Sequence, residues 1–494
     1  MSEVHRLLLS LKNSFAPINR IPPEVLSLIP DYLGNDTLDR GLIKLTQVCR
    51  RWRNAFTSRS SLWAKLDFTN VDKTRTYIQR SQLSPLKLRL IKDQHTSYLD
   101  DAFSLVIPHI HRLESLTVQG DVLPVALGHF RCPAPLLKEL YINLSRHPTT
   151  VLDSALFGGD LTSLRELTLR GNIANLPWKN LANLRKFGFL AHPIAPDVTQ
   201  HLDFFESAPL LRTVALVNSL PRTSDAPPKR IVPLRHLNAF SIFTRGSPPS
   251  ILLNHLHIPT GASLNLQFNF SGEESPLLDY LPEKYPNLRN LTHITAVNLR
   301  LHPREKYMRL SGSNGGLRLL ACWGPQETDS YTMDCRILHS LGLSILSATQ
   351  KLTISGYDHL EQNDPERCPV FQALSSTTNL RTLTLTECNN LPFVLALDPE
   401  ENPSESILCP KLEELVLYIR TLEQFHTDHL TSMACNRARR GARLSSVAIF
   451  SLGELVPGIE LLGLREHVGR VEHRVEDRPP RWDYVPGENG GEGN

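Results

Sequence analysis

The sequence predicts an α/β chain in which a short segment of three helices precedes a curved solenoid of repeats with a parallel sheet. Three observations predict this fold. Residues 21–63 concentrate apolar side chains at helical spacing. A phrase of the form L-x-x-L-x-L then returns along most of the remaining chain. Between its copies lie apolar stretches of helical spacing, such as residues 198–209 and 277–286.

The helical segment contains prolines that predict where its first helix begins and ends. Pro22 and Pro23 can open a helix, because the first helical positions need no donated N–H. Pro30 would clash with the preceding turn inside a helix, so we expect the first helix to kink or end near Ile29. The polar run GNDTLDRG at 34–41 is expected to form a long loop before the next helix.

The helical segment also predicts a partner. About 45 residues is near the lower size limit for a stable core without disulfides or metal. An apolar content this high in so few residues therefore predicts that another chain completes part of the surface.

Three stretches in order, IPPEVL (21–26), VCRRWR (48–53) and SLW (61–63), resemble the F-box of ubiquitin-ligase adaptors. The family pattern opens with Leu-Pro where this chain has Ile21–Pro22. The resemblance implies that the segment docks on a Skp-family adaptor and, through it, on a cullin. The adaptor-binding residues that the resemblance implies are Ile21, Pro22, Glu24, Val25, Leu26, Ile29, Leu33, Leu42, Leu45, Val48 and Trp52. Trp63 is expected to tie this segment to the first strand instead.

The phrase L-x-x-L-x-L predicts a ladder of strands, because residues two apart point to the same side of a strand. Its copies follow one another at intervals of 20 to 32 residues, close to the period of leucine-rich repeats. Proline often precedes a copy, where it ends the previous helix. The apolar centres of the copies are expected at residues 66, 88, 116, 140, 167, 187, 214, 240, 266, 294, 320, 352, 383, 415 and 447.

An F-box followed by such repeats resembles the fungal-type substrate receptors of SCF-type cullin–RING ubiquitin ligases. The resemblance implies a non-catalytic subunit whose solenoid binds a target protein. The alternative is a leucine-rich-repeat scaffold that binds the adaptor without forming a ligase. The expected domains are an N-terminal extension (1–17), the F-box (18–63), the solenoid (64–454), a C-terminal cap (455–478) and a disordered tail (479–494).

Composition bounds the remaining function classes. The net charge of +3 is unevenly distributed, with 15 Lys/Arg against 7 Asp/Glu in residues 1–90. The densest basic cluster, RRWR at 50–53, is either a solvated helix face or a contact for an acidic protein. Nucleic acid is disfavoured, because neither zinc-ligand spacing nor a stacking aromatic motif accompanies the charge. No apolar run reaches the ~18–20 residues that span a bilayer, so we expect no membrane partner.

No pattern predicts catalysis, a metal or a cofactor. The pairs His109/His111 and His255/His257 alternate as in a strand but lack neighbouring ligands at metal spacing. The loop GSNGG at 312–316 lacks the Lys-Ser/Thr ending of a phosphate-binding loop. The eight cysteines show no paired spacing, which favours reduced thiols and a location in the cytosol or nucleus.

Overall fold

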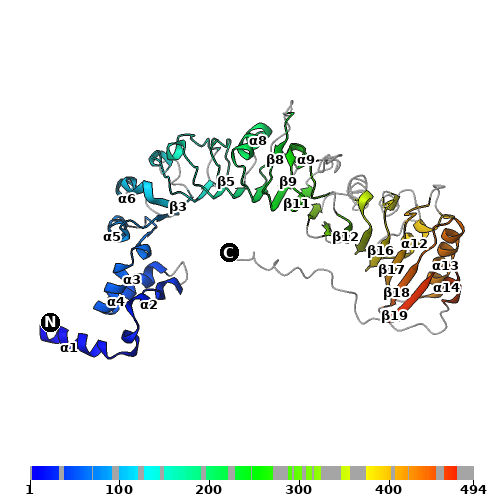
Figure 1. Cartoon of the computed structure of the whole chain (residues 1–494), viewed down its shortest axis with the longest axis horizontal. Helices are drawn as coiled ribbons and strands as arrows, with labels where there is room; N and C mark the ends of the chain where they lie inside the picture. Colours follow the sequence, from blue (N-terminus) through cyan, green and yellow to red (C-terminus); the bar gives the residue numbers. More distant parts are fainter. Residues whose placement is uncertain are drawn as a thin grey trace. The chain divides into compact units, whose positions relative to one another are not determined.

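The computed structural model describes residues 3–32, 38–68, 70–91, 99–120, 127–144, 149–190, 196–220, 229–245, 248–270, 287–291, 294–302, 307–313, 316–323, 346–356, 374–375, 377–401, 407–420, 422–451 and 461–475. It divides into two compact units, Met1–Leu211 and Arg212–Asn494. Figure 1 shows the elements of both units in chain order, and each unit is described here by itself.

The first unit opens with short helices. They are α1 (Glu3–Ser14), η1 (Pro17–Arg20), α2 (Pro23–Leu26), η2 (Ile29–Tyr32), α3 (Leu38–Val48), α4 (Arg50–Ser58) and η3 (Ser60–Trp63), where η marks a 3-10 helix. Pro23 is the first residue of α2, as predicted. The break expected near Ile29 is also present, because α2 ends at Leu26 and Pro30 lies in the separate turn η2.

The loop predicted over residues 34–41 is wrong in its second half, because α3 already begins at Leu38. The glycines and acidic residues of GNDTLDRG indicated a loop. Leu38, however, continues the helical spacing of Leu42 and Leu45, and the helix that buries Leu42 extends back over these polar residues.

After the helices, the first unit forms a parallel sheet. Its strands are β1 (Lys65–Leu66), β2 (Leu86–Ile91), β3 (Leu113–Gln119), β4 (Glu139–Leu144), β5 (Glu166–Gly171) and β6 (Lys186–Leu190), and each pairs with the next in parallel. The predicted centres lie side by side in register and are buried: Leu66, Leu88, Leu116, Leu140, Leu167 and Phe187. The ladder predicted for this part of the chain is therefore confirmed.

Helices and 3-10 turns connect these strands, namely α5 (Val71–Ser81), α6 (Leu99–Val106), η5 (Ile107–Arg112) and η6 (Leu156–Gly159), and α8 (Val198–Ser207) follows β6. The helix predicted over residues 198–209 is α8, and Asp197 caps it by accepting a hydrogen bond from the Gln200 N–H. The other predicted helix, at 277–286, lies outside the described residues. His109 and His111 lie in the 3-10 helix η5, directly before the predicted strand β3.

The second unit has eleven described strands in one sheet. They are β7 (Thr213–Val217), β9 (Ala239–Arg245), β11 (Ser263–Phe270), β12 (Ala296–His302), β13 (Tyr307–Gly312), β14 (Leu317–Trp323), β15 (Lys351–Ser355), β16 (Thr382–Thr386), β17 (Glu414–Ile419), β18 (Ser446–Ser451) and β19 (Arg470–Val475). The strands β8 (Val232–Pro233) and β10 (Leu256–His257) form a separate parallel pair. The helical elements are α9 (Ser250–Leu253), η9 (Leu346–Ala348), α12 (Leu391–Leu397), α13 (Gln424–Arg439) and α14 (Leu462–His467).

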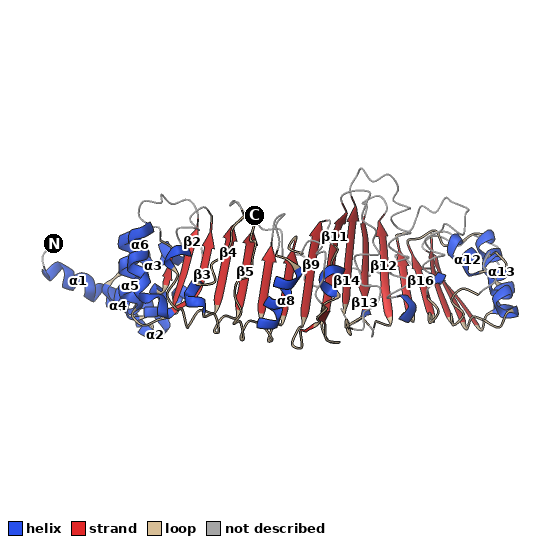
Figure 2. Ribbon diagram, turned by 90° about the horizontal axis from the view of Figure 1, so that it is seen from above, coloured by secondary structure: helices blue, strands red, loops and turns tan. Residues whose placement is uncertain are grey.

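The predicted simple succession of parallel strands is wrong in the middle of this sheet. The spatial order there is β11, β14, β13, β12, β15, and β13 runs antiparallel to both of its neighbours (Figure 2). The reason is an extra strand, YMRLSG at 307–312, that has no L-x-x-L-x-L phrase. Three consecutive strands form a meander, and the last of them fills the place beside β11.

Three of the expected centres in the same region are out of register. Leu264, not Leu266, pairs with the centre Phe240, a shift of two residues that keeps both leucines buried. Ile294 is buried before β12 begins, and Val297 takes the centre beside Leu352. In β14 the buried residues are Leu317 and Leu319, so the expected centre Leu320 points to the opposite face, because side chains alternate along a strand.

The strands β15 to β18 match the prediction, whereas β19 lies in the predicted cap at 455–478, where no strand was predicted. β15, β16, β17, β18 and β19 pair in parallel, each with the next. Leu352, Leu383, Leu415 and Val447 form one buried row across the first four. α12, α13 and α14 lie on one face of these strands (Figure 1). We call the opposite face the open face. The predicted tail at 479–494 lies outside the described residues, and the predicted domain limits stay predictions.

Candidate partner-binding surface

The helical segment of the first unit has its own closed core. Leu26, Leu42 and Phe56 are fully buried there, and Trp63 is nearly so. Leu26 and Leu42 were predicted as adaptor contacts, but neither has any exposed surface. They hold α2 and α3 in place, and a partner could touch them only after the helices rearranged.

Trp52 connects two of the helical elements. Its indole N–H donates to Asn19 Oδ1 at 3.0 Å, which joins α4 to η1. Its ring packs edge-on against Phe56, with the ring centroids 5.6 Å apart. The side chain is only partly exposed. Trp52 therefore fixes the position of the segment before α2, which contains the predicted contacts Ile21 and Pro22.

Arginines of the basic cluster bind backbone carbonyl groups within the chain. Arg51 donates to Ile21 O at 2.6 Å, and Arg53 donates to Thr46 O at 3.0 Å, near the end of α3. A cation at a helix C-terminus is favoured by the helix dipole and by the unpaired carbonyls there. This part of the cluster therefore supports the fold, while Arg51 and Arg53 remain exposed as on a solvated helix face.

Arg59 makes a comparable connection. It donates to Ser27 O at 2.6 Å and pairs with Asp31 at 2.9 Å, so it holds the break between α2 and η2. Arg59, the residue directly after α4, thus stabilises the bend at Pro30.

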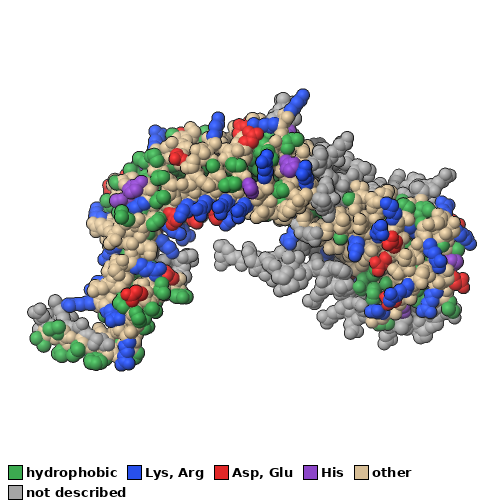
Figure 3. Space-filling view, in the orientation of Figure 1, with side chains coloured by type: hydrophobic (Ala, Val, Ile, Leu, Met, Phe, Trp, Pro, Cys, Tyr) green, Lys and Arg blue, Asp and Glu red, His purple; other side chains and the backbone are tan. Residues whose placement is uncertain are grey.

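Around this core, apolar side chains remain exposed. Val25 and Val48, both predicted contacts, are 51% and 57% exposed. Tyr32 is 87% exposed and was not predicted, and Leu28 and Ile43 are exposed as well. Figure 3 shows hydrophobic side chains on the visible face of the N-terminal helices. We call Val25, Leu28, Tyr32, Ile43 and Val48 the apolar surface of the helical segment.

The remaining predicted contacts are distributed between the core and the surface. Pro22 and Glu24 are exposed, and Glu24 lies in the first turn of α2, where the helix dipole favours a negative charge. Ile21, Ile29 and Leu45 are partly exposed. Leu33 lies outside the described residues.

A signal in the sequence could have separated the surface from the core. In α3 the buried positions are Leu42 and Thr46, four residues apart. Ile43 is one residue away from this stripe, about 100° around the helix, and therefore points elsewhere. The helical phase of an apolar residue, and not its apolarity alone, therefore separates surface from core in α3.

Trp63 contacts the helical segment and the helix α5, and the expected tie to the first strand stays a prediction. Its N–H donates to Phe56 O at 2.9 Å. Its ring meets Tyr77 of α5 edge-on at 5.0 Å between centroids, and the Arg80 guanidinium lies 4.3 Å from the ring centroid. The packing partner outside the helical segment is thus α5.

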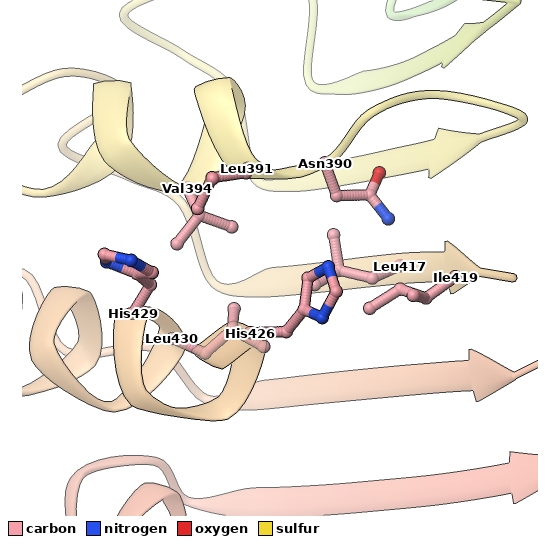
Figure 4. A pocket seen from close by; sticks show the side chains of 8 residues that line it. All are labelled: Asn390, Leu391, Val394, Leu417, Ile419, His426, His429 and Leu430. Carbon is pink, nitrogen blue, oxygen red and sulfur yellow. The ribbon is translucent and has the colours of Figure 1, made fainter. Parts of the chain in front are cut away.

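A pocket in the second unit lies between α12, α13 and β17 (Figure 4). Leu391, Val394, Leu417, Ile419 and Leu430 give it mostly apolar walls, with Asn390, His426 and His429 beside them. His426 Nδ1 accepts the Glu423 N–H at 3.2 Å, as part of a capping box at the start of α13. This histidine is thus engaged in holding a helix end, and the pocket pairs it with no nucleophile among its lining residues.

The described ranges contain no group of three His, Cys, Asp or Glu side chains arranged to hold a metal ion. None of their helices combines the length and apolarity that a membrane crossing requires. The cysteines they contain, Cys49, Cys132, Cys322, Cys388, Cys409 and Cys435, are free thiols.

Comparison with known proteins identifies the helical segment. A family model for F-box-like domains matches residues 18–69. The match covers the helices from η1 to η3 and the strand β1. No curated protein sequence matches the chain. The chain therefore contains an F-box-like domain followed by a long, largely parallel sheet with helices between its strands.

Proposed function

We propose that this chain is the substrate-recognition subunit of an SCF-type cullin–RING ubiquitin ligase. The F-box-like domain would dock on a Skp-family adaptor, which links it to a cullin, and the sheet would bind a target protein. The observation that supports the proposal most is the F-box-like match at residues 18–69, in a domain that leaves apolar side chains exposed around a closed core.

The exposed side chains are the proposed direct contacts. Val25 and Val48 would bury their apolar surface against the adaptor, together with Leu28, Tyr32 and Ile43. Pro22 and Glu24 would contact it at the start of α2. Burial of apolar surface contributes ~25 cal/mol per Å², so these side chains would make the free energy of association more favourable. Leu26, Leu42 and Trp52 would act indirectly, by holding these side chains in place.

We further infer that the sheet is an array of leucine-rich repeats from residue 64 to about 454. The buried ladder, the parallel pairing and the intervals of 20 to 32 residues support this assignment. Stacked repeats present a long open face, which suits the binding of a protein. Such a subunit would work in the cytosol or the nucleus.

In this role the chain supplies no catalytic group. It would hold the target close to the ubiquitin-loaded enzyme on the same assembly, so that an encounter between separate molecules becomes one within a complex. The gain is an effective concentration in the millimolar range or above for a well-matched geometry. Target choice would then depend on the open face of the sheet.

Affinity purification with identification of the bound proteins tests the proposal. The wild-type chain is compared with the double variant Val25→Asp, Val48→Asp, whose new charges lie on the exposed surface and spare the core. We expect adaptor and cullin with the wild type and a loss of at least 10-fold with the variant. Val151→Asp is the matched control, because Val151 is 70% exposed in the same unit but outside the F-box-like domain.

The outcomes separate the functions. If the wild type captures the adaptor and no cullin, the chain is a scaffold that holds the adaptor without a ligase. If it captures neither, or if the double variant captures both as well as the control does, the apolar surface of the helical segment is not the docking site.

A further inference from the structure

The strand β19 is the last described strand of the second unit, and its outer side differs from the rest of the sheet (Figure 1). Among the strands of this unit that the structure describes, β19 pairs with β18 alone. The core-facing row that is fully buried at Val447 and Ile449 continues on β19 with Val471 and His473, which are only half-buried. Val475, the next residue on this face, is 52% exposed. Burial of the core face therefore decreases at this edge.

The backbone of β19 presents hydrogen-bonding groups to the edge. The Arg470 N–H donates to Ser445 O at 2.9 Å, so it points towards β18. The N–H and C=O groups of successive strand residues point to alternate sides, hence those of Val471, His473 and Val475 point away from β18. Such a row of groups at a sheet edge is a template for a further strand.

Charged side chains lie on the open face of the same strand. Arg470 and Arg474 donate to Glu472 at 2.7 Å and 3.1 Å, and both bonds end on Oε1 of this carboxylate. Glu472 Oε2 accepts no hydrogen bond from a described residue, so it can accept one from a second chain. The Arg474 side chain is 63% exposed and is open to a second chain as well.

The order of charges in β19 fits a second copy of the same strand. In an antiparallel pair with the two His473 residues opposite each other, Glu472 of each copy faces Arg474 of the other. Val471 then faces Val475 on the core side, and these outward-pointing residues exchange the backbone hydrogen bonds. Glu472 and Arg474 form the non-hydrogen-bonded pairs, in which side chains lie closest together. The two carboxylates and the two Arg474 guanidinium groups balance in charge.

Other registers bring like charges together. Moving the second copy by two residues keeps as many paired positions, but it puts Glu472 opposite Glu472 and Arg470 opposite Arg474. A parallel pair in register also places each charge opposite its own kind. Like charges directly opposite each other destabilise a strand pair. Charged side chains at an edge commonly prevent pairing between copies, whereas those of β19 favour one arrangement.

We propose that β19 pairs in antiparallel orientation with β19 of a second copy of this chain, so that the two sheets continue into one another. The inference does not depend on the proposed function, because it rests on this edge alone. Six residues a side is far fewer than the ~20–30 of a standard interface, so the dimer is weak and reversible. It offers two open faces, and a target that spans both is held with higher avidity.

Sedimentation equilibrium of the full-length chain at about 1–100 μM tests the proposal. We expect a reversible equilibrium between monomer and dimer. Arg474→Glu puts carboxylates opposite each other at both contacts and should weaken the dimer roughly 10-fold. Glu472→Arg combined with Arg474→Glu exchanges the charges and should restore the wild-type dissociation constant. Arg439→Glu is the matched control, because Arg439 is 70% exposed on α13, and it should change nothing.

Two further measurements separate this arrangement from others. The labelled double variant, mixed with the wild type, should form no mixed dimer, because each antiparallel contact then joins like charges. A parallel pair would favour the mixed dimer instead. Val475→Pro removes an outward N–H and leaves the charges unchanged, so it should weaken the dimer as well.

Several results would overturn the proposal. These are a monomer at every concentration, the same dissociation constant for Arg474→Glu as for the control, no recovery in the double variant, or a preference for mixed dimers. A dimer that is lost in Val25→Asp, Val48→Asp but kept in Arg474→Glu would assign self-association to the apolar surface of the helical segment. Capture of the adaptor, measured in parallel, reports on the proposed function separately.

Discussion

Single residues with unusual surroundings stabilise the second unit. Arg437 of α13 has no exposed surface, although its guanidinium is charged. Its guanidinium donates to Leu408 O at 2.8 Å and to Cys409 O at 2.9 Å. It thereby pairs carbonyl groups of the segment before β17 that would otherwise be buried without a donor. Burial raises the pKa of the neighbouring Cys409 thiol to about 11, so this thiol stays protonated at neutral pH.

Replacing Arg437 tests this role. Arg437→Ala leaves two buried carbonyls without donors and opens a cavity, so we expect the free energy of unfolding to fall by about 3 kcal/mol. Chemical denaturation measures the change. Arg439→Ala is the control, because Arg439 is exposed and lies on the same helix, and it should cost less than about 0.5 kcal/mol. Equal effects of the two variants would contradict the structural role.

His426 makes the stability of α13 depend on pH. Burial lowers the pKa of His426, although Glu423 acts in the opposite direction. Its Nδ1 must be unprotonated to accept the Glu423 N–H. A group whose pKa is lower in the folded state contributes its stability above its unfolded value of about 6.5 and loses it as pH falls through the folded value.

The midpoint of thermal unfolding should therefore fall as the pH decreases below 6.5. The glutamine in His426→Gln cannot be protonated, so the midpoint of this variant should fall by less than that of the wild type over the same pH range. Scanning calorimetry at pH 7.5 and 5.5 measures both chains. An identical pH dependence in the two would show that His426 contributes nothing to it.

At the scale of elements, the strands of the sheet are held by ladders of buried side chains. The sequence predicted these ladders well where an L-x-x-L-x-L phrase is followed by another one, as in β3, β4 and β5. It failed at β12, β13 and β14, because a strand without the phrase was inserted there. Pairing partners far apart in sequence decide such an order, and no local pattern encodes them.

Leu167 lies in the middle of the first ladder and is 1% exposed. Leu167→Ala should lower the free energy of unfolding by ~2–5 kcal/mol through the cavity it leaves. Thr168→Ala, one residue along β5 and on the opposite face, is the matched control and should change it by less than about 1 kcal/mol. An unchanged denaturation curve for Leu167→Ala would mean that Leu167 is not in the ladder.

At the scale of the whole molecule, the proposed array of repeats should respond locally. In a stacked array each repeat contacts only its neighbours, so stability is close to a sum of repeat and neighbour terms. Destabilising β5 by Leu167→Ala should therefore raise amide hydrogen exchange mainly in β4, β5 and β6. The strands β15 to β19 of the second unit should keep their wild-type rates.

Hydrogen exchange followed by mass spectrometry measures this response. The reciprocal variant, Leu385→Ala in β16, is the control and should act on the second unit alone, since Leu385 is fully buried there. An equal rise in exchange throughout both units for either variant would show one cooperative unit instead of a repeat array.

The sequence by itself determined the type of each part. The F-box-like segment, the helix break at Pro30 and most ladder residues follow from periodicity and from the steric limits of proline, which act over a few residues. Only the tertiary structure decided which apolar residues of the helical segment remain exposed. It also placed Arg51 and Arg53 on backbone carbonyls and made β19, with Glu472 and Arg474, the last described strand of the second unit. The physical reason is that burial and neighbourhood depend on how segments distant in sequence pack, whereas periodicity reports only that a side of an element is apolar.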